Sequence, residues 1–121
     1  MKLNLGSGDF KLDGYVNIDC RPQHDPDICC KVEDLNYDEE TVDEIYASHI
    51  LEHLDLEQGR TLLKNCYKWL IKGGVLSIVV PDLLVVCRFI AEGDTDGTLW
   101  SWLYGRHDIE EGMGHKWGYT Q

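Results

Sequence analysis

The sequence has little basic charge and no long hydrophobic run, and each absence excludes a class of function. Eleven Lys and Arg stand against 22 Asp and Glu among 121 residues, so the net charge is −11 with histidine neutral. A surface this acidic repels nucleic acid and anionic membranes, and we expect neither as a partner. The longest apolar stretch, residues 75–90, is interrupted by Pro81, Asp82 and Arg88, so no segment is expected to span a bilayer.

A disulfide framework and a secretion signal are also missing. The five cysteines are odd in number and include no CxxC pair, which is typical of reduced thiols in a cytoplasmic protein. Met1-Lys2 leads straight into Leu3 to Leu5 without the apolar run of a signal peptide. No repeat or Pro/Gly/Ser-rich linker divides the chain, and we expect a single domain over residues 1–121.

Short apolar runs alternate with turn residues and helical patterns, which is typical of an α/β fold with a mainly parallel sheet. Strands are predicted at residues 2–5, 15–18, 28–32, 42–47 and 75–80, and helices at 56–71, 83–92 and 98–104. Gly73 and Gly74 are expected to end the first helix. The last strand is rich in β-branched residues and does not alternate between apolar and polar residues, so we expect it to be buried on both faces.

Ligands of open α/β sheets bind beyond the carboxyl ends of the strands, and four predicted strand ends carry suitable residues. Gly6-Ser7-Gly8 follows the first strand and offers backbone N–H groups to an anionic group. Asp19 follows the second strand, where a carboxylate accepts hydrogen bonds from both hydroxyls of a ribose. Asp34-Leu35 combines an acceptor with an apolar side chain, which suits an adenine ring, and Ser48-His49 ends the fourth strand.

Five segments, taken in order, resemble the motifs of class I S-adenosylmethionine (SAM)-dependent methyltransferases. They are Leu3 to Gly8, Asn17 to Asp19, Glu33 to Leu35, Val42 to His53 and Gly73 to Leu76. The resemblance covers residues 2–81 and, more loosely, His115 to Tyr119. It implies a Rossmann-like three-layer sandwich with a parallel sheet of about five strands, lacking the last two strands of the family's sheet.

The resemblance also implies the cofactor, SAM, and its contacts. Gly6 and Gly8 would line the methionine portion, Asp19 the ribose, Asp34-Leu35 the adenine, and Ser48 the wall near the sulfonium. The predicted cofactor residues are Asn4, Gly6, Ser7, Gly8, Asp19, Cys20, Asp34, Leu35 and Ser48.

A general base is required only where the methyl acceptor is protonated at working pH. By position, the candidate bases are His49, His115 and Asp82. The acid-rich surface favours a small-molecule or sugar-like acceptor over nucleic acid. Two other functions stay open: a non-catalytic remnant that binds SAM or a nucleotide, and an interaction subunit.

The sequence departs from the family at three places. Asn4 stands where the family usually has an acid, and Phe10 stands at the third glycine of the usual pattern. Only residues 9–14 separate the first two strands, so we expect a loop there instead of a helix.

Without the last two strands, residues 75–80 become an apolar edge. We expect residues 83–119 to cover this edge, or two copies to form a homodimer through it.

The segment from His49 to His53 also matches the HxxEH motif of inverted zinc peptidases. No distal acidic helix supplies a third ligand, and the methyltransferase motif accounts for the same residues. The group Cys20, His24, Cys29 and Cys30 lacks the spacing of a zinc ribbon or knuckle. We therefore expect no metal from either pattern.

Overall fold

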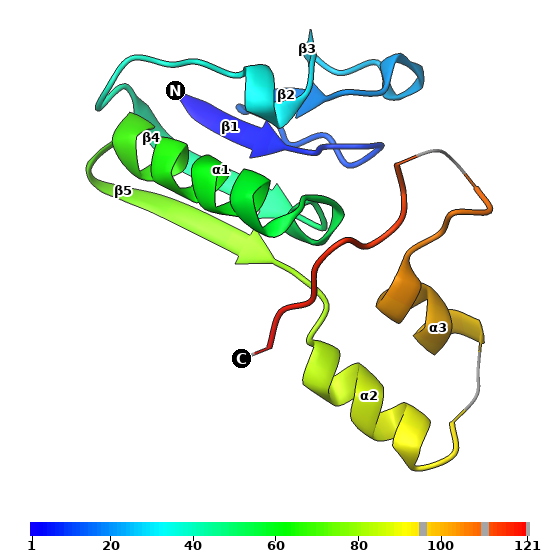
Figure 1. Cartoon of the computed structure of the whole chain (residues 1–121). Helices are drawn as coiled ribbons and strands as arrows, with labels where there is room; N and C mark the ends of the chain where they lie inside the picture. Colours follow the sequence, from blue (N-terminus) through cyan, green and yellow to red (C-terminus); the bar gives the residue numbers. More distant parts are fainter. Residues whose placement is uncertain (95–96, 110–111, 121) are drawn as a thin grey trace.

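A parallel five-stranded sheet forms the centre of the computed structural model, which describes residues 1–94, 97–109 and 112–120 (Figure 1). The strands are β1 Lys2–Leu5, β2 Val16–Asp19, β3 Ile28–Cys29, β4 Val42–Ser48 and β5 Leu70–Val79. The α-helices are α1 Leu56–Trp69, α2 Leu83–Ala91 and α3 Gly97–Tyr104. Three short 3-10 turns are η1 Pro22–His24, η2 Val32–Asp34 and η3 Leu51–His53.

The strand order is β3-β2-β1-β4-β5, with every neighbouring pair parallel. This confirms the predicted α/β class and the parallel sheet. From β1 the chain adds β2 and β3 on one side of the sheet, and it then returns to add β4 and β5 on the other side of β1. A topological switch point therefore lies at the carboxyl ends of the two central strands, β1 and β4. Ligand-binding residues are therefore expected at that edge.

One face of the sheet is apolar and packs against α1. Leu3 and Leu5 of β1 pair with Ile45 and Ala47 of β4, and all four are at most 3% exposed. They belong to the same buried cluster as Leu62, Cys66 and Trp69 of α1. The helix begins at Asp55, whose carboxylate accepts the Gln58 N–H while the Gln58 side chain accepts the Asp55 N–H. This capping box fixes where α1 starts and so how its apolar side meets the sheet.

The other face is polar beside β1 and is covered there by the loop that joins β1 to β2. The amide nitrogen of Asn4 donates to the carbonyl of Phe10 and to Asn17 Oδ1, both at 2.9 Å. Asn17 Oδ1 also accepts the Leu12 N–H at 2.8 Å. These bonds hold the loop against the sheet, so the first crossover is a loop, as predicted.

Two details of the predicted elements are wrong. The first helix ends at Trp69, and Gly73 and Gly74 lie inside β5. The pairing of β5 with β4 shifts between Val42 and Glu44, so residues 71–74 lie opposite Asp43. Gly73 has a φ of +85°, a conformation that suits a bulge in a strand and that a helix-stop glycine also favours. The third strand is also shorter than predicted, because Val32 begins the turn η2.

The prediction that the last strand is buried on both faces is wrong as well. Val75, Ile78 and Val79 keep 53%, 39% and 41% of their surface exposed, because β5 is an edge strand with a neighbour on one side. Helices α2 and α3 lie away from this edge, beyond the carboxyl end of the sheet (Figure 1). In the described parts of the chain, residues 83–119 therefore do not cover it.

The segment after α3, here called the tail (residues 112–120), returns to the sheet. Lys116 and Trp117 donate their backbone N–H groups to the Glu52 carbonyl at 2.7 and 3.3 Å. The Leu83 N–H donates to the Tyr119 carbonyl at 2.8 Å. The tail is thus fixed beside η3, next to the carboxyl ends of the strands. Within the described ranges, no helix is long and apolar enough to cross a membrane.

Candidate functional site

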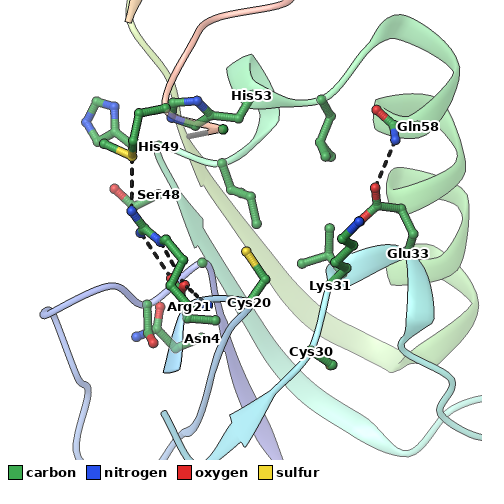
Figure 2. A pocket seen from close by; sticks show the side chains of 18 of the residues that line it. Asn4, Cys20, Arg21, Cys30, Lys31, Glu33, Ser48, His49, His53 and Gln58 are labelled. Atoms are coloured by element: carbon green, nitrogen blue, oxygen red, sulfur yellow. Dashed lines mark hydrogen bonds and ion pairs between the residues drawn. The ribbon is translucent and has the colours of Figure 1, made fainter. Parts of the chain in front are cut away.

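A cavity of about 680 Å³ lies at the carboxyl ends of the strands, as the topology predicts. Its volume is within the range of small-molecule sites. The wall combines the segments after β1, β2, β3 and β4 with η3, α1 and the tail (Figure 2). Its residues are Asn4, Gly6, Ser7, Phe10, Asp19, Cys20, Arg21, Cys30, Lys31, Val32, Glu33, Tyr46, Ser48, His49, Ile50, His53, Leu54, Gln58, Gly112, Met113 and Lys116.

Six of the nine predicted cofactor residues line this cavity, namely Asn4, Gly6, Ser7, Asp19, Cys20 and Ser48. Gly8 lies beside them, because its N–H donates to Asp19 Oδ2 at 2.9 Å. Asn4 donates its amide hydrogens to the Phe10 carbonyl in the β1–β2 loop and to Asn17 Oδ1 in β2. Its role in the structure is therefore to shape the cavity wall.

Asp34 and Leu35 do not line the cavity. Asp34 is exposed, and Leu35 is 8% exposed and belongs to the core. Val32 and Glu33 line the cavity in their place, and Glu33 Oε1 accepts a hydrogen bond from Gln58 Nε2 at 2.9 Å. The turn η2 (Val32–Asp34) produces this change, because it fixes which residues after β3 point into the cavity.

Asp19 is the most constrained carboxylate of the cavity. Its side chain is 3% exposed and accepts four hydrogen bonds: from the N–H groups of Gly8 and Arg21, both at 2.9 Å, and from Arg21 Nε and Nη2 at 3.0 and 3.3 Å. Burial by itself raises the pKa of the Asp19 carboxyl. The hydrogen bonds from Arg21 and Gly8 outweigh burial and lower this pKa below its usual value. Asp19 is therefore held as an anion.

Arg21 was not predicted as a site residue, and it lies between Asp19 and the tail. Its Nη1 donates to Met113 Sδ at 3.0 Å, while Nε and Nη2 face Asp19 (Figure 2). A basic residue two positions after a strand-end acid was the available signal in the sequence. Arg21 connects the end of β2 to the tail and narrows the access to Asp19.

The bend after β1 requires a residue without a side chain. Gly6 has a φ of +65°, and a Cβ on it would lie 2.9 Å from the Ile50 side chain. The next residue, Ser7, is 4% exposed, and its Oγ has no hydrogen-bond partner among the residues that the structure describes. An unpaired buried hydroxyl at a cavity wall suits a polar ligand group.

Of the three candidate bases, His49 lines the cavity. It has a φ of +53°, a conformation that is strained for a residue with a side chain. Its Nδ1 lies 3.0 Å from Oε1 of Glu52, which is 2% exposed. Because a carboxylate accepts hydrogen bonds, the neutral form of the His49 ring carries its hydrogen on Nδ1 and has a lone pair on Nε2.

The other two candidate bases lie elsewhere. Asp82 is the N-cap of α2, where its Oδ1 accepts the N–H groups of Leu84 and Val85. His115 lines a second hollow of about 260 Å³ together with Glu52, and its ring meets the His53 ring edge-on at 5.0 Å. Burial and the neighbouring His53 lower the pKa of the His115 imidazole.

Comparison with protein families agrees with this arrangement, whereas a search of curated proteins gives no significant match. The profile of the family described as "Methyltransferase domain" matches residues 15–78. The matched segment runs from just before β2 to the second-last residue of β5 and so contains the ends of β2, β3 and β4, which form part of the cavity. Members of this family use SAM as methyl donor. With more than half of its length matched, the chain belongs to the SAM-dependent methyltransferase domain family.

Proposed function

We propose that the cavity binds SAM with the ribose at Asp19 and that the protein transfers the methyl group to a small-molecule or sugar-like acceptor. The observation that carries this proposal is the position of the Asp19 carboxylate, which lies at the end of β2 against the Gly8 N–H and lines the cavity. A buried anion there is suited to accept hydrogen bonds from two vicinal hydroxyls.

The residues of the cavity fit the remaining parts of SAM. Gly6 leaves the backbone accessible at the end of β1, and the unpaired Ser7 Oγ offers a hydrogen bond to the amino-acid portion. Val32, Leu54 and Glu33 supply apolar surface and a carboxylate for an adenine ring at the α1 side of the cavity. When bound, SAM supplies an electrophilic methyl group, and the protein contributes chiefly by aligning the acceptor with it.

His49 is the side chain that we assign to the acceptor. Its Nε2 lone pair can accept a hydrogen bond from an acceptor hydroxyl, because Glu52 holds the hydrogen on Nδ1. Trp102 lies edge-on to His49 with ring centres 6.3 Å apart and is 46% exposed. An exposed indole beside the hydroxyl-binding group is suited to pack on the apolar face of a sugar ring.

Isothermal titration calorimetry with SAM tests the binding site. Asp19→Asn removes the negative charge and keeps the shape, so SAM should bind about tenfold to a hundredfold more weakly, the value of one hydrogen bond to a charged group. Asp34→Asn is the matched control and should bind as the wild type does, because Asp34 is exposed and lies outside the cavity. Equal loss of affinity in the two variants would contradict the assignment of Asp19.

Acceptor classes are then compared by measuring release of S-adenosylhomocysteine with panels of sugars, small phenols and amines. The proposal predicts turnover with hydroxyl-bearing small molecules and none with oligonucleotides. Tight SAM binding without turnover across all panels would instead favour the non-catalytic alternative.

The exposed edge of β5 supports a homodimer as the assembly. Val75, Ile78 and Val79 are exposed on a strand whose outer hydrogen-bonding groups face solvent in the described structure, and such edges associate unless they are covered. Light scattering should give twice the chain mass for the wild type and the monomer mass for Val79→Lys. Weak interfaces form at concentrations of about 100 μM, so a wild type that is monomeric at this concentration would exclude the assembly.

A further inference from the structure

The most unusual group outside the proposed SAM contacts is the carboxylate of Glu52. This side chain is 2% exposed. Its Oε1 is bonded to His49 Nδ1, but its Oε2 is buried and has no hydrogen-bond partner in the described structure. A buried carboxylate oxygen without a partner costs several kcal/mol in a protein interior unless a cation or a donor approaches it. Glu52 therefore indicates that a cation or a hydrogen-bond donor is missing beside Oε2.

Two imidazoles lie close to this carboxylate. His53 follows Glu52 in η3, and His115 comes from the tail. One ligand atom from each of Glu52, His53 and His115 lies within 4.8 Å of the other two. Both rings are partly buried, so the three groups meet in a sheltered place between the two hollows.

The backbone brings these residues together. Lys116 and Trp117 donate their N–H groups to the Glu52 carbonyl, and the His115 N–H donates to the Tyr104 carbonyl at 3.0 Å. The tail is therefore bonded directly to the residue whose Oε2 lacks a partner in the described structure. The position of His115 beside Glu52 is a consequence of main-chain bonds and does not depend on the side chains alone.

His53 has one nitrogen directed at a carbonyl group, because its Nδ1 lies 3.1 Å from the Gly114 carbonyl. Because a carbonyl only accepts, the nitrogen facing it carries the hydrogen and the other nitrogen keeps a lone pair. Histidine ligands of metal ions are oriented in the same way, with the second nitrogen donating to a carbonyl or carboxylate.

We propose that Glu52, His53 and His115 form a binding site for a divalent transition metal of the zinc class. Two imidazole nitrogens and one carboxylate oxygen are a common ligand set for zinc, and three protein ligands leave a fourth position open. In a tetrahedral zinc site the ligand atoms are about 3.3 Å apart, so the three groups must move closer by an ångström or more. Oε1 of Glu52 keeps its bond to His49, which orients the ligating carboxylate.

This site does not depend on the SAM proposal, because its ligands differ from the SAM contacts and its test measures metal binding. It also differs from the linear HxxEH pattern, in which His49 would be a ligand. In the structure His49 Nδ1 is bonded to Oε1 of Glu52 and is not one of the proposed ligands, and the third ligand, His115, comes from the tail.

Zinc binding to the full chain is measured by competition with a chromophoric chelator under reducing conditions. The wild type should bind one zinc ion, and His115→Ala and His53→Gln should each bind at least tenfold more weakly, since each removes a ligand. His24→Ala is the matched control and should not change the affinity, because His24 pairs with Asp9 and lines neither of the two hollows. Far-UV circular dichroism verifies the fold of each variant, and two ligand variants on different segments keep the test valid if one does not fold.

The absorption spectrum of bound cobalt(II) distinguishes binding at this site from binding at the five free cysteines. Binding at Glu52, His53 and His115 predicts visible d–d bands without a sulfur-to-cobalt charge-transfer band. A charge-transfer band in the stoichiometric complex, wild-type affinity in both ligand variants, or no stoichiometric binding at all would each overturn the proposal.

Discussion

Replacing Arg21 with alanine should strengthen SAM binding and weaken the fold at the same time. The reason is the hydrogen-bond capacity of Asp19. Two carboxylate oxygens offer about four lone-pair positions, and Arg21 and Gly8 already occupy them with four hydrogen bonds. A ribose that bonds to Asp19 through two hydroxyls must therefore displace the two bonds from the Arg21 side chain.

The size of this effect follows from the geometry of the pair. A hydrogen bond to a charged group contributes about 1.5–3 kcal/mol, and the lower end applies because Arg21 is 24% exposed and its Nη2 bond is 3.3 Å long. Arg21→Ala removes this cost of displacement, so SAM should bind about tenfold more tightly. The free energy of unfolding should fall by about 1.5–3 kcal/mol, because the buried Asp19 carboxylate loses its charged partner.

Calorimetry with SAM and urea unfolding measure the two quantities on the same preparation. Arg60→Ala is the matched control, since it removes the same charge from a side chain that is 61% exposed and paired with Glu57. It should change neither affinity nor stability by more than a few tenths of a kcal/mol. Weaker SAM binding by Arg21→Ala would show that the guanidinium contacts the ligand, and the displacement mechanism would be wrong.

The same pair predicts a pH dependence of stability. Because the folded-state pKa of Asp19 is lowered, its ionised form stabilises the fold above the unfolded-state pKa of about 4, and this contribution is lost as the pH falls through the folded value. In Arg21→Ala, burial acts against fewer hydrogen bonds, so the pKa should rise. An NMR titration of the Asp19 carboxyl carbon measures both values, and an unchanged pKa in the variant would contradict Arg21 as the cause.

Three further predictions concern the walls of the cavity. Gly6→Ala should lower the free energy of unfolding by about 1–2 kcal/mol in urea titrations, because φ is +65° and the added Cβ would lie 2.9 Å from Ile50; an unchanged midpoint would contradict the strain. Asp55→Ala should cost about 1 kcal/mol by the same measurement, since α1 loses its capping box. His49→Ala should lower kcat about tenfold or more while the Kd for SAM stays within about twofold, because His49 is assigned to the acceptor; a parallel loss of SAM affinity would reassign it.

The approximate positions of the strands and the main ligand-binding edge could be predicted from the sequence because they depend on local patterns. Leu3 and Leu5 alternate with polar neighbours, Asp19 follows directly after an apolar run, and Gly6 stands at a strand end. Each of these features is set by residues close together in the chain. The short distance between Gly8 and Asp19 likewise excluded a helix after β1, and the structure has a loop there.

The features that the sequence did not predict depend on the direction in which side chains point or on contacts between segments that are far apart in the chain. Val32 and Glu33 line the cavity instead of Asp34 and Leu35, because a single 3-10 turn changes which residues face inward. Gly73 and Gly74 suit both a helix end and a bulge, and only the pairing of β5 with β4 separates the two. The contact of Met113 with Arg21 joins segments 92 residues apart, for which no local pattern exists.

Asp19, Glu33 and Glu52 are three carboxylates in or beside the cavity, and they differ in the partner that each one has. This difference connects the two proposed sites. Asp19 is paired with an arginine that a ribose can replace, and Glu33 is bonded to the neutral amide of Gln58. Glu52 is the most buried of the three, yet one of its oxygens has no partner in the described part of the chain. In a protein of net charge −11, basic side chains are scarce, and the groups next to Glu52 are the imidazoles of His53 and His115, each of which offers one ligand nitrogen. A metal ion satisfies the carboxylate and both rings together, which a proton or a water molecule cannot do.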